Sequence, residues 1–321
     1  MKEWTEFEIE EYRKQLIKKG VPVIFDLEHL RRLIGFEKNK FYKIFYKLEY
    51  QYREIKIPKR KKGEFRVLSV PSRNLKMIQR WILDNILYAI PCSDNATGFV
   101  PLRSVSDNAV PHLGHKYIYK FDLRDFFPSI TKSKVFFLFK DMGYTNELSN
   151  ALALLCSFNN ALPQGGPTSP YIANLLCKRL DLRINNFCEK HNFYYTRYAD
   201  DITISGGKKL IRYKLFFKNI IEESGFNFHE GKSKLIRDGQ RKLVTGVVVN
   251  QKLTIPRDYV RKIKQELYYI NKYGVDDHLA YNQIPLSSKK YMKELRGKIN
   301  YIHMVDKRLG EELKLILNGT R

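Results

Sequence analysis

Closely spaced cysteines, long apolar runs and a leader-like start are all missing from this chain of 321 residues. Its four cysteines form no C-x-x-C pair, which argues against a disulfide framework and against a zinc site. The charged start MKEWTEFEIEEYRKQ lacks the apolar core of a secretory signal, and no apolar run reaches membrane-spanning length. We therefore expect a cytoplasmic protein with reduced cysteines and no membrane partner.

Negative charge is scarce as well. The chain has 58 Lys and Arg against 34 Asp and Glu, which gives a formal net charge of +24. Such an excess attracts polyanions, and the 21 Tyr and 20 Phe residues interleaved with it suit stacking on unpaired bases. The plainer alternative is a lysine-rich soluble surface with the rings packed in a core. We favour a nucleic-acid partner, because solubility alone rarely needs so large an imbalance.

Hydrophobic periodicity predicts a mixed chain of helices and strands. The stretch 1–50 has helical spacing, and 52–70 alternates like a hairpin with a basic tip at 59–63. Pro71-Ser72 begins a helix that reaches about Ala89. Further along we expect, in order, a strand at 117–123, helices from 132 and over 146–158, a loop at 162–170 followed by a long helix, a strand–turn–strand at 195–205, a helix at 208–224, short strands at 243–255, and basic helices from 256 with a loop at 279–288.

Three carboxylates fall where predicted strands end or turn. Asp122 ends the strand at 117–123, and Asp200 and Asp201 lie at the turn of the later hairpin. Neighbouring strands of one antiparallel sheet would bring the three together, and carboxylates that close cannot all stay ionised without a cation. Oxygen ligands without His or Cys favour Mg²⁺ or Mn²⁺, and two such ions can activate a hydroxyl nucleophile and stabilise a pyrophosphate leaving group. Taken alone, however, the adjacent acids better fit a solvated turn.

The residues around these acids carry a family resemblance. Tyr198-Ala199-Asp200-Asp201 resembles the Y-x-D-D signature of reverse transcriptases, and 121–127 (FDLRDFF) resembles their first catalytic motif. Between them, 162–170 (LPQGGPTSP) resembles the loop that meets nucleotide and template. The order and spacing of all three match the family, so we interpret the acids as catalytic.

Two further stretches narrow the resemblance. Asn108 to His112 (NAVPH) and Val244 to Gly246 (VTG) are similar to the N-A-x-x-H and V-T-G elements of retron reverse transcriptases. Over roughly residues 50–250, the chain is identified as a member of that type. The resemblance implies an α+β right-hand polymerase fold of three parts: N-terminal helices and fingers at 1–115, a palm with an antiparallel sheet at 116–250 that holds an inserted part of the fingers (about 131–165), and a basic helical thumb or RNA-binding region at 251–321.

The resemblance also implies residue roles at the active site. Asp122, Asp200 and Asp201 would bind two Mg²⁺ ions, with Mn²⁺ able to substitute and the Leu123 carbonyl completing the ligands. Phe127 would clash with a 2′-hydroxyl and so select deoxynucleotides. The residues implied in dNTP binding are Lys62, Arg66, Asp125, Phe126, Phe127, Gln164 and Lys232. For each lysine of the hairpin tip, a merely solvated charge is the alternative.

Nucleic-acid contacts are implied in two places, the loop before the first catalytic motif and the basic C-terminal helices. The residues that would hold RNA or primer are Asn108, His112, Arg257, Arg261, Lys264, Lys289 and Arg296. His112 is equally compatible with a buried structural histidine. The basic helices are also compatible with a bundle that has one solvated face.

The function that the resemblance implies is RNA-directed DNA synthesis in the bacterial cytoplasm. The template would be the cognate noncoding RNA (msr-msd), and the product branched multicopy single-stranded DNA primed from a guanosine 2′-hydroxyl. Implied partners are an effector protein of an antiphage defence system and a host ribonuclease H that acts on the hybrid. One alternative is a scaffold that holds the RNA–DNA hybrid and restrains the effector. The other is a reverse transcriptase of the group II intron or diversity-generating type, against which the N-A-x-x-H and V-T-G stretches argue.

Overall fold

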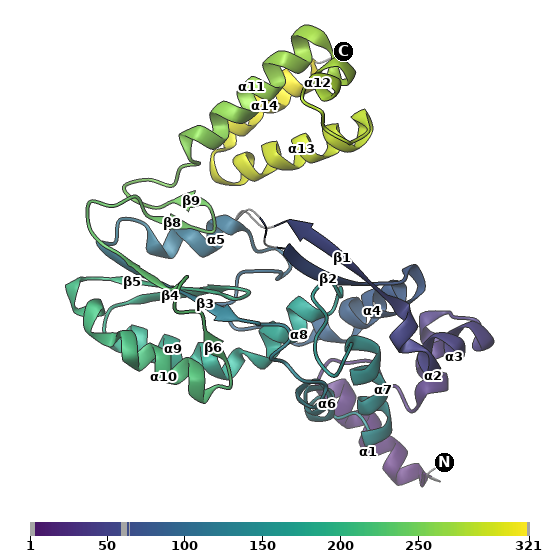
Figure 1. Cartoon of the computed structure of the whole chain (residues 1–321). Coiled ribbons are helices and arrows are strands. Elements are labelled where there is room, and N and C mark those ends of the chain that lie inside the picture. The colour runs from purple at the N-terminus through teal and green to yellow at the C-terminus, as the bar shows by residue number, and fades with distance from the viewer. Residues whose placement is uncertain (1–3, 59–62, 64, 320–321) are drawn as a thin grey trace.

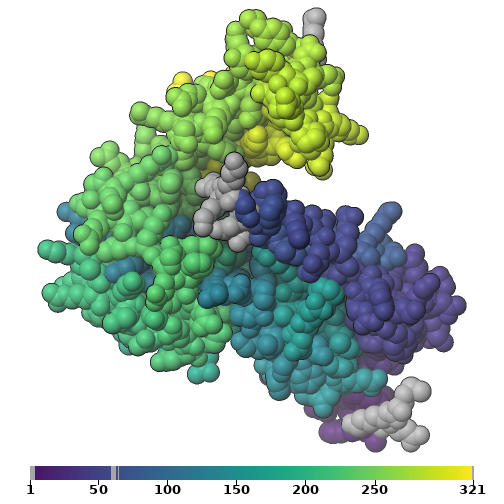
Figure 2. All heavy atoms as spheres, in the orientation of Figure 1, coloured from purple at the N-terminus to yellow at the C-terminus, as the bar shows by residue number. Residues whose placement is uncertain are grey.

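The computed structural model describes residues 4–58, 63 and 65–319. Figure 1 shows three regions around an open centre, which we call the fingers (α1–α4, α6, α7 and the β1–β2 hairpin), the palm (the β3–β7 sheet with α8–α10) and the thumb (α11–α14). In the space-filling view, the surface is hollowed between the thumb and the fingers (Figure 2). None of the helices among the described residues has the length and apolar character that crossing a bilayer requires.

The fingers follow the predicted pattern of helices and one hairpin. Ser72 caps the helix after the hairpin, because its hydroxyl accepts the Leu75 N–H. The basic hairpin tip at 59–62 lies outside the described residues. The elements are α1 (Glu6–Lys18), α2 (Leu27–Ile34), α3 (Lys38–Tyr46), β1 (Tyr52–Pro58) antiparallel to β2 (Phe65–Pro71), α4 (Arg73–Asn85), α6 (Lys132–Asp141) and α7 (Asn146–Cys156), with 3₁₀ turns at Leu48–Gln51 and Leu87–Ala89.

The palm is an antiparallel sheet in the order β4-β5-β3-β6, with β7 pairing the other end of β3. Its strands are β3 (Tyr117–Arg124), β4 (Tyr194–Tyr198), β5 (Asp201–Gly206), β6 (Asn227–Phe228) and β7 (Lys234–Ile236). The helices α9 (Lys178–Lys190) and α10 (Lys214–Glu223) lie against one face (Figure 1), α8 (Ser169–Leu176) leads into α9, and a 3₁₀ turn spans Lys208–Tyr213. Because β3 is central, the acid at its end is flanked by strands on both sides.

The predicted pattern differs from the structure in three places. The long helix after residue 170 is two helices, α8 and α9, because Cys177 between them has a ψ of −3°, outside the helical range. The strands β6 and β7 were not predicted, since two or three residues are too few to show an alternating pattern. Part of the expected loop at 279–288 is helical, because α12 extends to Tyr281.

The thumb has a hydrophobic core of its own. It consists of α11 (Arg257–Tyr273), α12 (Val275–Tyr281), α13 (Ser288–Val305) and α14 (Lys307–Asn318). Its centre is built from Ile263, Leu267, Leu295, Ile299 and Leu313, whereas one larger core runs through both fingers and palm. A small third cluster that includes Ala109, Ile118, Val244 and Val247 lies where the thumb meets the palm. The elements there are α5 (Val105–Ala109), the 3₁₀ turn Val110–His112, and the hairpin of β8 (Leu243–Val244) and β9 (Val247–Val248).

Candidate active site

The two strands that carry the predicted catalytic acids pair directly with each other. Asp122 on β3 lies opposite Asp201 on β5 in the antiparallel register. Residues in this relation lie on the same face of a sheet, so the two carboxylates are neighbours. Asp200 lies in the two-residue turn between β4 and β5, and its carbonyl accepts the Leu123 N–H at 3.0 Å. The sheet therefore sets Asp122 beside Asp201 and carries Asp200 in the adjoining turn.

A lysine ammonium already neutralises part of this charge. Lys232 Nζ donates to Asp122 Oδ1 at 2.8 Å, from the connection between β6 and β7. That connection is fixed to β3, because the His229 N–H donates to the Asp122 carbonyl at 2.7 Å. The Lys232 side chain is 58% exposed and the Asp122 side chain 17% exposed, so the ion pair opens to solvent. Lys232, which was predicted to bind the nucleotide, therefore forms an ion pair with the predicted catalytic carboxylate of Asp122.

The surroundings of Asp200 disfavour its charged form. Burial raises the pKa of its carboxyl group above the ordinary range, and the charges of Asp201 and Asp122 raise it further. A divalent cation among these oxygens would relieve both effects, so the donor set fits a hard metal ion. Within 4–58, 63 and 65–319, however, no group of three or more His, Cys, Asp or Glu side chains is placed so that it could hold a metal ion. The Leu123 carbonyl was also predicted to be a metal ligand. Leu123 is buried and follows Asp122 directly on β3.

The chain bends sharply after β3 at three residues predicted to bind the nucleotide. Asp125 has a φ of 47°, a left-handed conformation uncommon for residues other than glycine. Phe126 is buried against Phe226, with ring centroids 5.6 Å apart. Phe127 packs on Phe126 and is only half-buried. Of the two rings, Phe127 is therefore the one that stays accessible to a bound nucleotide.

The fingers hairpin meets the loop that was predicted to contact nucleotide and template. The Ser69 N–H on β2 donates to the Gln164 carbonyl at 2.9 Å. Gly165 has a φ of 131°, and a Cβ there would lie 2.9 Å from the Ser69 carbonyl oxygen, so this close approach requires glycine. Arg66 lies on the same strand with an exposed side chain. Lys62, also predicted to bind the nucleotide, lies outside the described residues.

Comparison with known proteins decides the family. Residues 57–252 match the family model for reverse transcriptase (RNA-dependent DNA polymerase). The chain is 33% identical to Retron Ec86 reverse transcriptase of Escherichia coli over 298 residues, which are 91% of this chain and 93% of that protein. The chain belongs to the retron reverse transcriptases. It is also 34% identical to Retron Mx162 reverse transcriptase of Myxococcus xanthus over 290 residues, covering 78% of this chain and 57% of that protein.

Membership in the retron reverse transcriptases confirms the predicted activity and fold class. The chain is an RNA-directed DNA polymerase, a nucleotidyltransferase, and its helices and sheet form the right-hand polymerase fold. Among solved structures, apo telomerase from Candida tropicalis aligns with a TM-score of 0.46 at 14% identity, over 83% of this chain and 64% of that one. So small a likeness has no bearing on activity.

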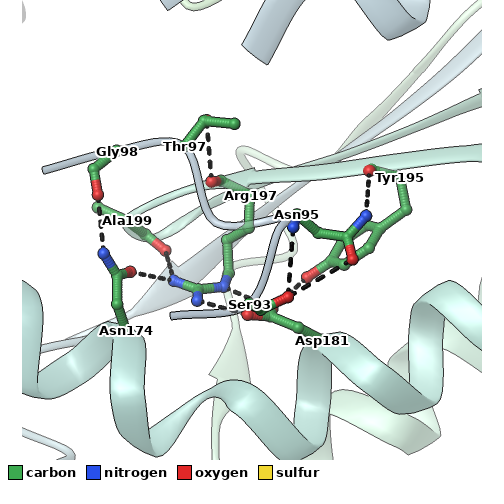
Figure 3. A network of polar contacts seen from close by, with 9 residues as sticks. All are labelled: Ser93, Asn95, Thr97, Gly98, Asn174, Asp181, Tyr195, Arg197 and Ala199. Carbon is green, nitrogen blue, oxygen red and sulfur yellow. Dashed lines mark hydrogen bonds and ion pairs between the residues drawn. The ribbon is translucent and has the colours of Figure 1, made fainter. Parts of the chain in front are cut away.

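We call the turn of Ala199 and Asp200 between β4 and β5 the catalytic turn, because Asp200 is predicted to be catalytic. Beneath it, this reverse transcriptase buries an ion pair that sequence reasoning missed. Arg197 on β4 and Asp181 on α9 are both 0% exposed and joined by two hydrogen bonds of 2.7 Å (Figure 3). Tyr195 OH donates to the same carboxylate at 2.6 Å. The Arg197 guanidinium also donates to the Ala199 carbonyl at 3.1 Å, which ties the pair to the turn that carries Asp200. The one signal in the sequence was Arg197 itself, a charged residue within a strand pattern.

The same network surrounds the strained residue of the catalytic turn. Ala199 has a φ of 53°, which a residue with a Cβ rarely adopts. Gly98 packs on this turn, since a Cβ there would lie 3.0 Å from Ala199 N. Asn174 joins the two sides: its amide donates to the Gly98 carbonyl at 2.8 Å and accepts from Arg197 at 2.9 Å (Figure 3). Buried polar groups therefore hold the Ala199–Asp200 turn from beneath.

Two residues predicted to contact RNA lie inside the protein. His112 is fully buried, with its ring nitrogens 2.7 Å from Ser205 Oγ and 2.8 Å from Thr196 Oγ1. Burial lowers the pKa of His112 to about 3, so the ring is neutral. Asn108 is 1% exposed, and both ends of its amide are hydrogen-bonded within the protein. The expectation of direct RNA contact is corrected for both side chains, because a buried and satisfied group has nothing left to offer a ligand.

Three of the five basic residues predicted to bind RNA line one cavity. This cavity of about 910 Å³ lies between the thumb helix α11 and the palm, and we call it the basic cleft. Its cations are Lys116, Lys242, Lys252, Arg257, Arg261 and Lys264. Of these, Lys264 pairs with Glu312 at 2.8 Å, and Lys242 lies 3.7 Å from Asp238. Lys289 and Arg296 on α13 are not among the lining residues.

Proposed function

We propose that this reverse transcriptase copies a cognate structured noncoding RNA (msr-msd) into branched multicopy single-stranded DNA, with a guanosine 2′-hydroxyl of that RNA as the primer. The relationship to Retron Ec86 reverse transcriptase supports the proposal, because it extends over 91% of the chain and well beyond the palm. The observation that carries the chemistry is the register of β3 and β5, which sets Asp122 opposite Asp201.

Two Mg²⁺ ions are the proposed cofactors, with Mn²⁺ able to substitute. Asp122, Asp200 and Asp201 would hold them, together with the Leu123 carbonyl. Oxygen-only donors suit hard divalent ions, and such ions would offset both the burial and the neighbouring charges that raise the pKa of Asp200. When bound, the ions would activate the attacking hydroxyl and offset the charge of the pyrophosphate leaving group.

The chain's own side chains would then bind and select the nucleotide. Lys232, whose ammonium lies 2.8 Å from Asp122, is suited to donate a proton to the departing pyrophosphate. Phe127, the more accessible of the two rings, would exclude a ribose 2′-hydroxyl. Arg66 and Lys62 would clamp the triphosphate from the fingers hairpin, and Gln164 would touch the incoming nucleotide. Asp125 and Phe126 would present backbone N–H groups to the phosphates at the bend.

The basic cleft is the proposed contact for the RNA backbone. The side chains of Arg257, Arg261 and Lys264 supply cations along one helix, which matches the repeating charge of a phosphodiester backbone. Lys289 and Arg296, which lie outside the cleft, would contact the RNA or primer elsewhere on the thumb. In the bacterial cytoplasm, the product would serve antiphage defence with an effector protein, and a host ribonuclease H would trim the hybrid.

The test is synthesis on the noncoding RNA encoded beside this gene. Purified protein with that RNA, Mg²⁺ and the four dNTPs should give DNA joined covalently to RNA, which a 2′,5′-debranching enzyme separates. A matched RNA with 2′-deoxyguanosine at the branch position should give no product. The contrary result is that the protein extends only annealed primers that carry a 3′-hydroxyl. That result would contradict priming from a 2′-hydroxyl but leave the polymerase activity standing.

A further inference from the structure

The two short elements typical of retron reverse transcriptases touch each other. Asn108, of the N-A-x-x-H stretch, donates from Nδ2 to Thr245 Oγ1, of the V-T-G stretch, at 3.2 Å across 137 residues of sequence. The other end of the same amide accepts from Thr97 Oγ1 at 2.8 Å. Asn108 is 1% exposed and Thr245 is half-buried, so this contact is partly covered by the protein.

The backbone at Thr245 makes this contact unusual. Thr245 and Gly246 form the two-residue turn between β8 and β9, with φ values of 46° and 85°. Such a turn favours Asn-Gly, and a β-branched residue in its first position is an outlier. The Thr245 hydroxyl offers a reason for the residue, because it is the group that receives the Asn108 amide.

The thumb rests on the other side of this turn. Tyr301 OH on α13 donates to the Thr245 carbonyl at 3.2 Å. A Cβ on Gly246 would lie 2.6 Å from the same hydroxyl oxygen, so glycine is required for clearance as well as for its φ. A second contact lies close by, where Ser106 Oγ on α5 donates to the Met304 carbonyl at 2.9 Å. Figure 1 shows α5 and the β8–β9 hairpin layered between α13 and the palm sheet.

The palm side of the contact leads to the strand before the catalytic turn. Thr196 Oγ1 on β4 donates to the Asn108 carbonyl at 3.2 Å. The Thr97 N–H donates to the Arg197 carbonyl at 2.9 Å (Figure 3). The Thr97 hydroxyl in turn donates to the Asn108 side chain. An unbroken series of hydrogen bonds thus runs from Tyr301 through Thr245, Asn108 and Thr97 to β4.

We propose that Asn108 and Thr245 are positioning residues, which hold the thumb at a fixed place over the catalytic turn. We call Asn108, Thr245, Gly246 and Tyr301 the thumb joint. A thumb held in register keeps the primer end at the carboxylates between successive additions, so the joint sets how many nucleotides are added in one binding event. This inference needs only the polymerase activity and is independent of 2′-hydroxyl priming.

The test is extension of an annealed DNA primer on an RNA template by the full chain, with a heparin trap that permits one binding event. Thr245→Val removes the hydroxyl and keeps the shape, and it should shorten the products several-fold while the KM for dNTP stays unchanged. Thr245→Ser keeps the hydroxyl and should restore wild-type product length. Tyr268→Phe, which removes a hydroxyl from an exposed ring elsewhere on the thumb, is the matched control and should change nothing.

Coupling between the two residues provides the second measurement. If Asn108 and Thr245 act through their mutual contact, the double variant Asn108→Ala with Thr245→Val should shorten products no more than the stronger single variant. A loss of folded protein would lower the amount of product without changing its length per binding event. Wild-type product length in Thr245→Val, or single effects that multiply in the double variant, would overturn the proposal. Should Thr245→Val fail to fold, Tyr301→Phe decides: shortened products support the joint, and wild-type length refutes it.

Discussion

Two hairpin turns of this reverse transcriptase place a non-glycine residue in the left-handed region, and they support it in different ways. The catalytic turn between β4 and β5 has Ala199 at a φ of 53°, and the V-T-G turn between β8 and β9 has Thr245 at 46°. The first is held by the guanidinium of a fully buried ion pair, which donates to its carbonyl. The second is held by a neutral amide that donates to a hydroxyl.

The difference follows from what each turn carries. The catalytic turn bears Asp200 next to Asp201 and close to Asp122, and like charges push such a turn apart unless it is rigidly held. The V-T-G turn bears no charge, and its Thr245 carbonyl accepts the Tyr301 hydroxyl of the thumb. The buried Arg197–Asp181 ion pair therefore supports the turn that carries the acids. The neutral Asn108–Thr245 hydrogen bond supports the turn where the thumb meets the palm.

Removing the charged support should destabilise the protein far more than removing the neutral one. Arg197→Ala leaves Asp181 charged, buried and unpaired, which costs about 3–5 kcal/mol of unfolding free energy. Asn108→Ala removes hydrogen bonds between neutral groups alone, at about 1–3 kcal/mol. Urea denaturation of both variants measures the two losses.

A control separates the unpaired charge from lost packing. Replacing both partners at once, with Arg197→Met and Asp181→Leu, should recover a large part of the stability that Arg197→Ala loses, because no buried charge remains. Equal losses for Arg197→Ala and Asn108→Ala would erase the distinction between the two turns.

Lys232 provides a smaller effect, which falls on rate and not on stability. Lys232→Ala should slow single-turnover incorporation about 100-fold, the lower end of what a lost proton donor costs. Its unfolding free energy should change by less than about 1 kcal/mol, because the ion pair with Asp122 opens to solvent. Lys218→Ala, which removes a nearby lysine over the Phe228 ring, is the matched control and should keep the wild-type rate. An unchanged rate in Lys232→Ala would remove Lys232 from the chemistry.

The smallest expected effect is on how the stability of the metal-free protein depends on pH. Because the pKa of Asp200 is raised in the folded protein, the folded state binds a proton more tightly than the unfolded chain. Stability therefore falls as pH rises from the ordinary carboxyl range through the raised pKa, and stays lower above it. In EDTA, Asp200→Asn should melt at a higher temperature than wild type at neutral pH and lose this advantage in acid. An equal or lower melting temperature at neutral pH would argue against the raised pKa.

The sequence predicted most of the long helices and strands, because their hydrophobic periodicity is a local pattern. It also predicted that Asp122 and Asp201 lie close together, because the order and spacing of the motifs indicated neighbouring strands. It could not predict the inward placement of Asn108 and His112, since residue type does not tell which side of a loop is covered. Arg197 and Asp181 were missed because complete burial of two charges is rare and their pairing joins separate elements. Their role became visible only when both were found beneath one turn.

If DNA synthesis takes place at Asp122, Asp200 and Asp201 while RNA is held elsewhere on the chain, the two properties can be separated by mutation. We would compare DNA synthesis and RNA affinity in one preparation of the double variant Asp200→Asn with Asp201→Asn. Synthesis should be lost and RNA affinity unchanged, because the substitutions remove charge from the catalytic turn and leave the basic cleft intact. Normal synthesis by the double variant would show that these carboxylates are not the site of the chemistry.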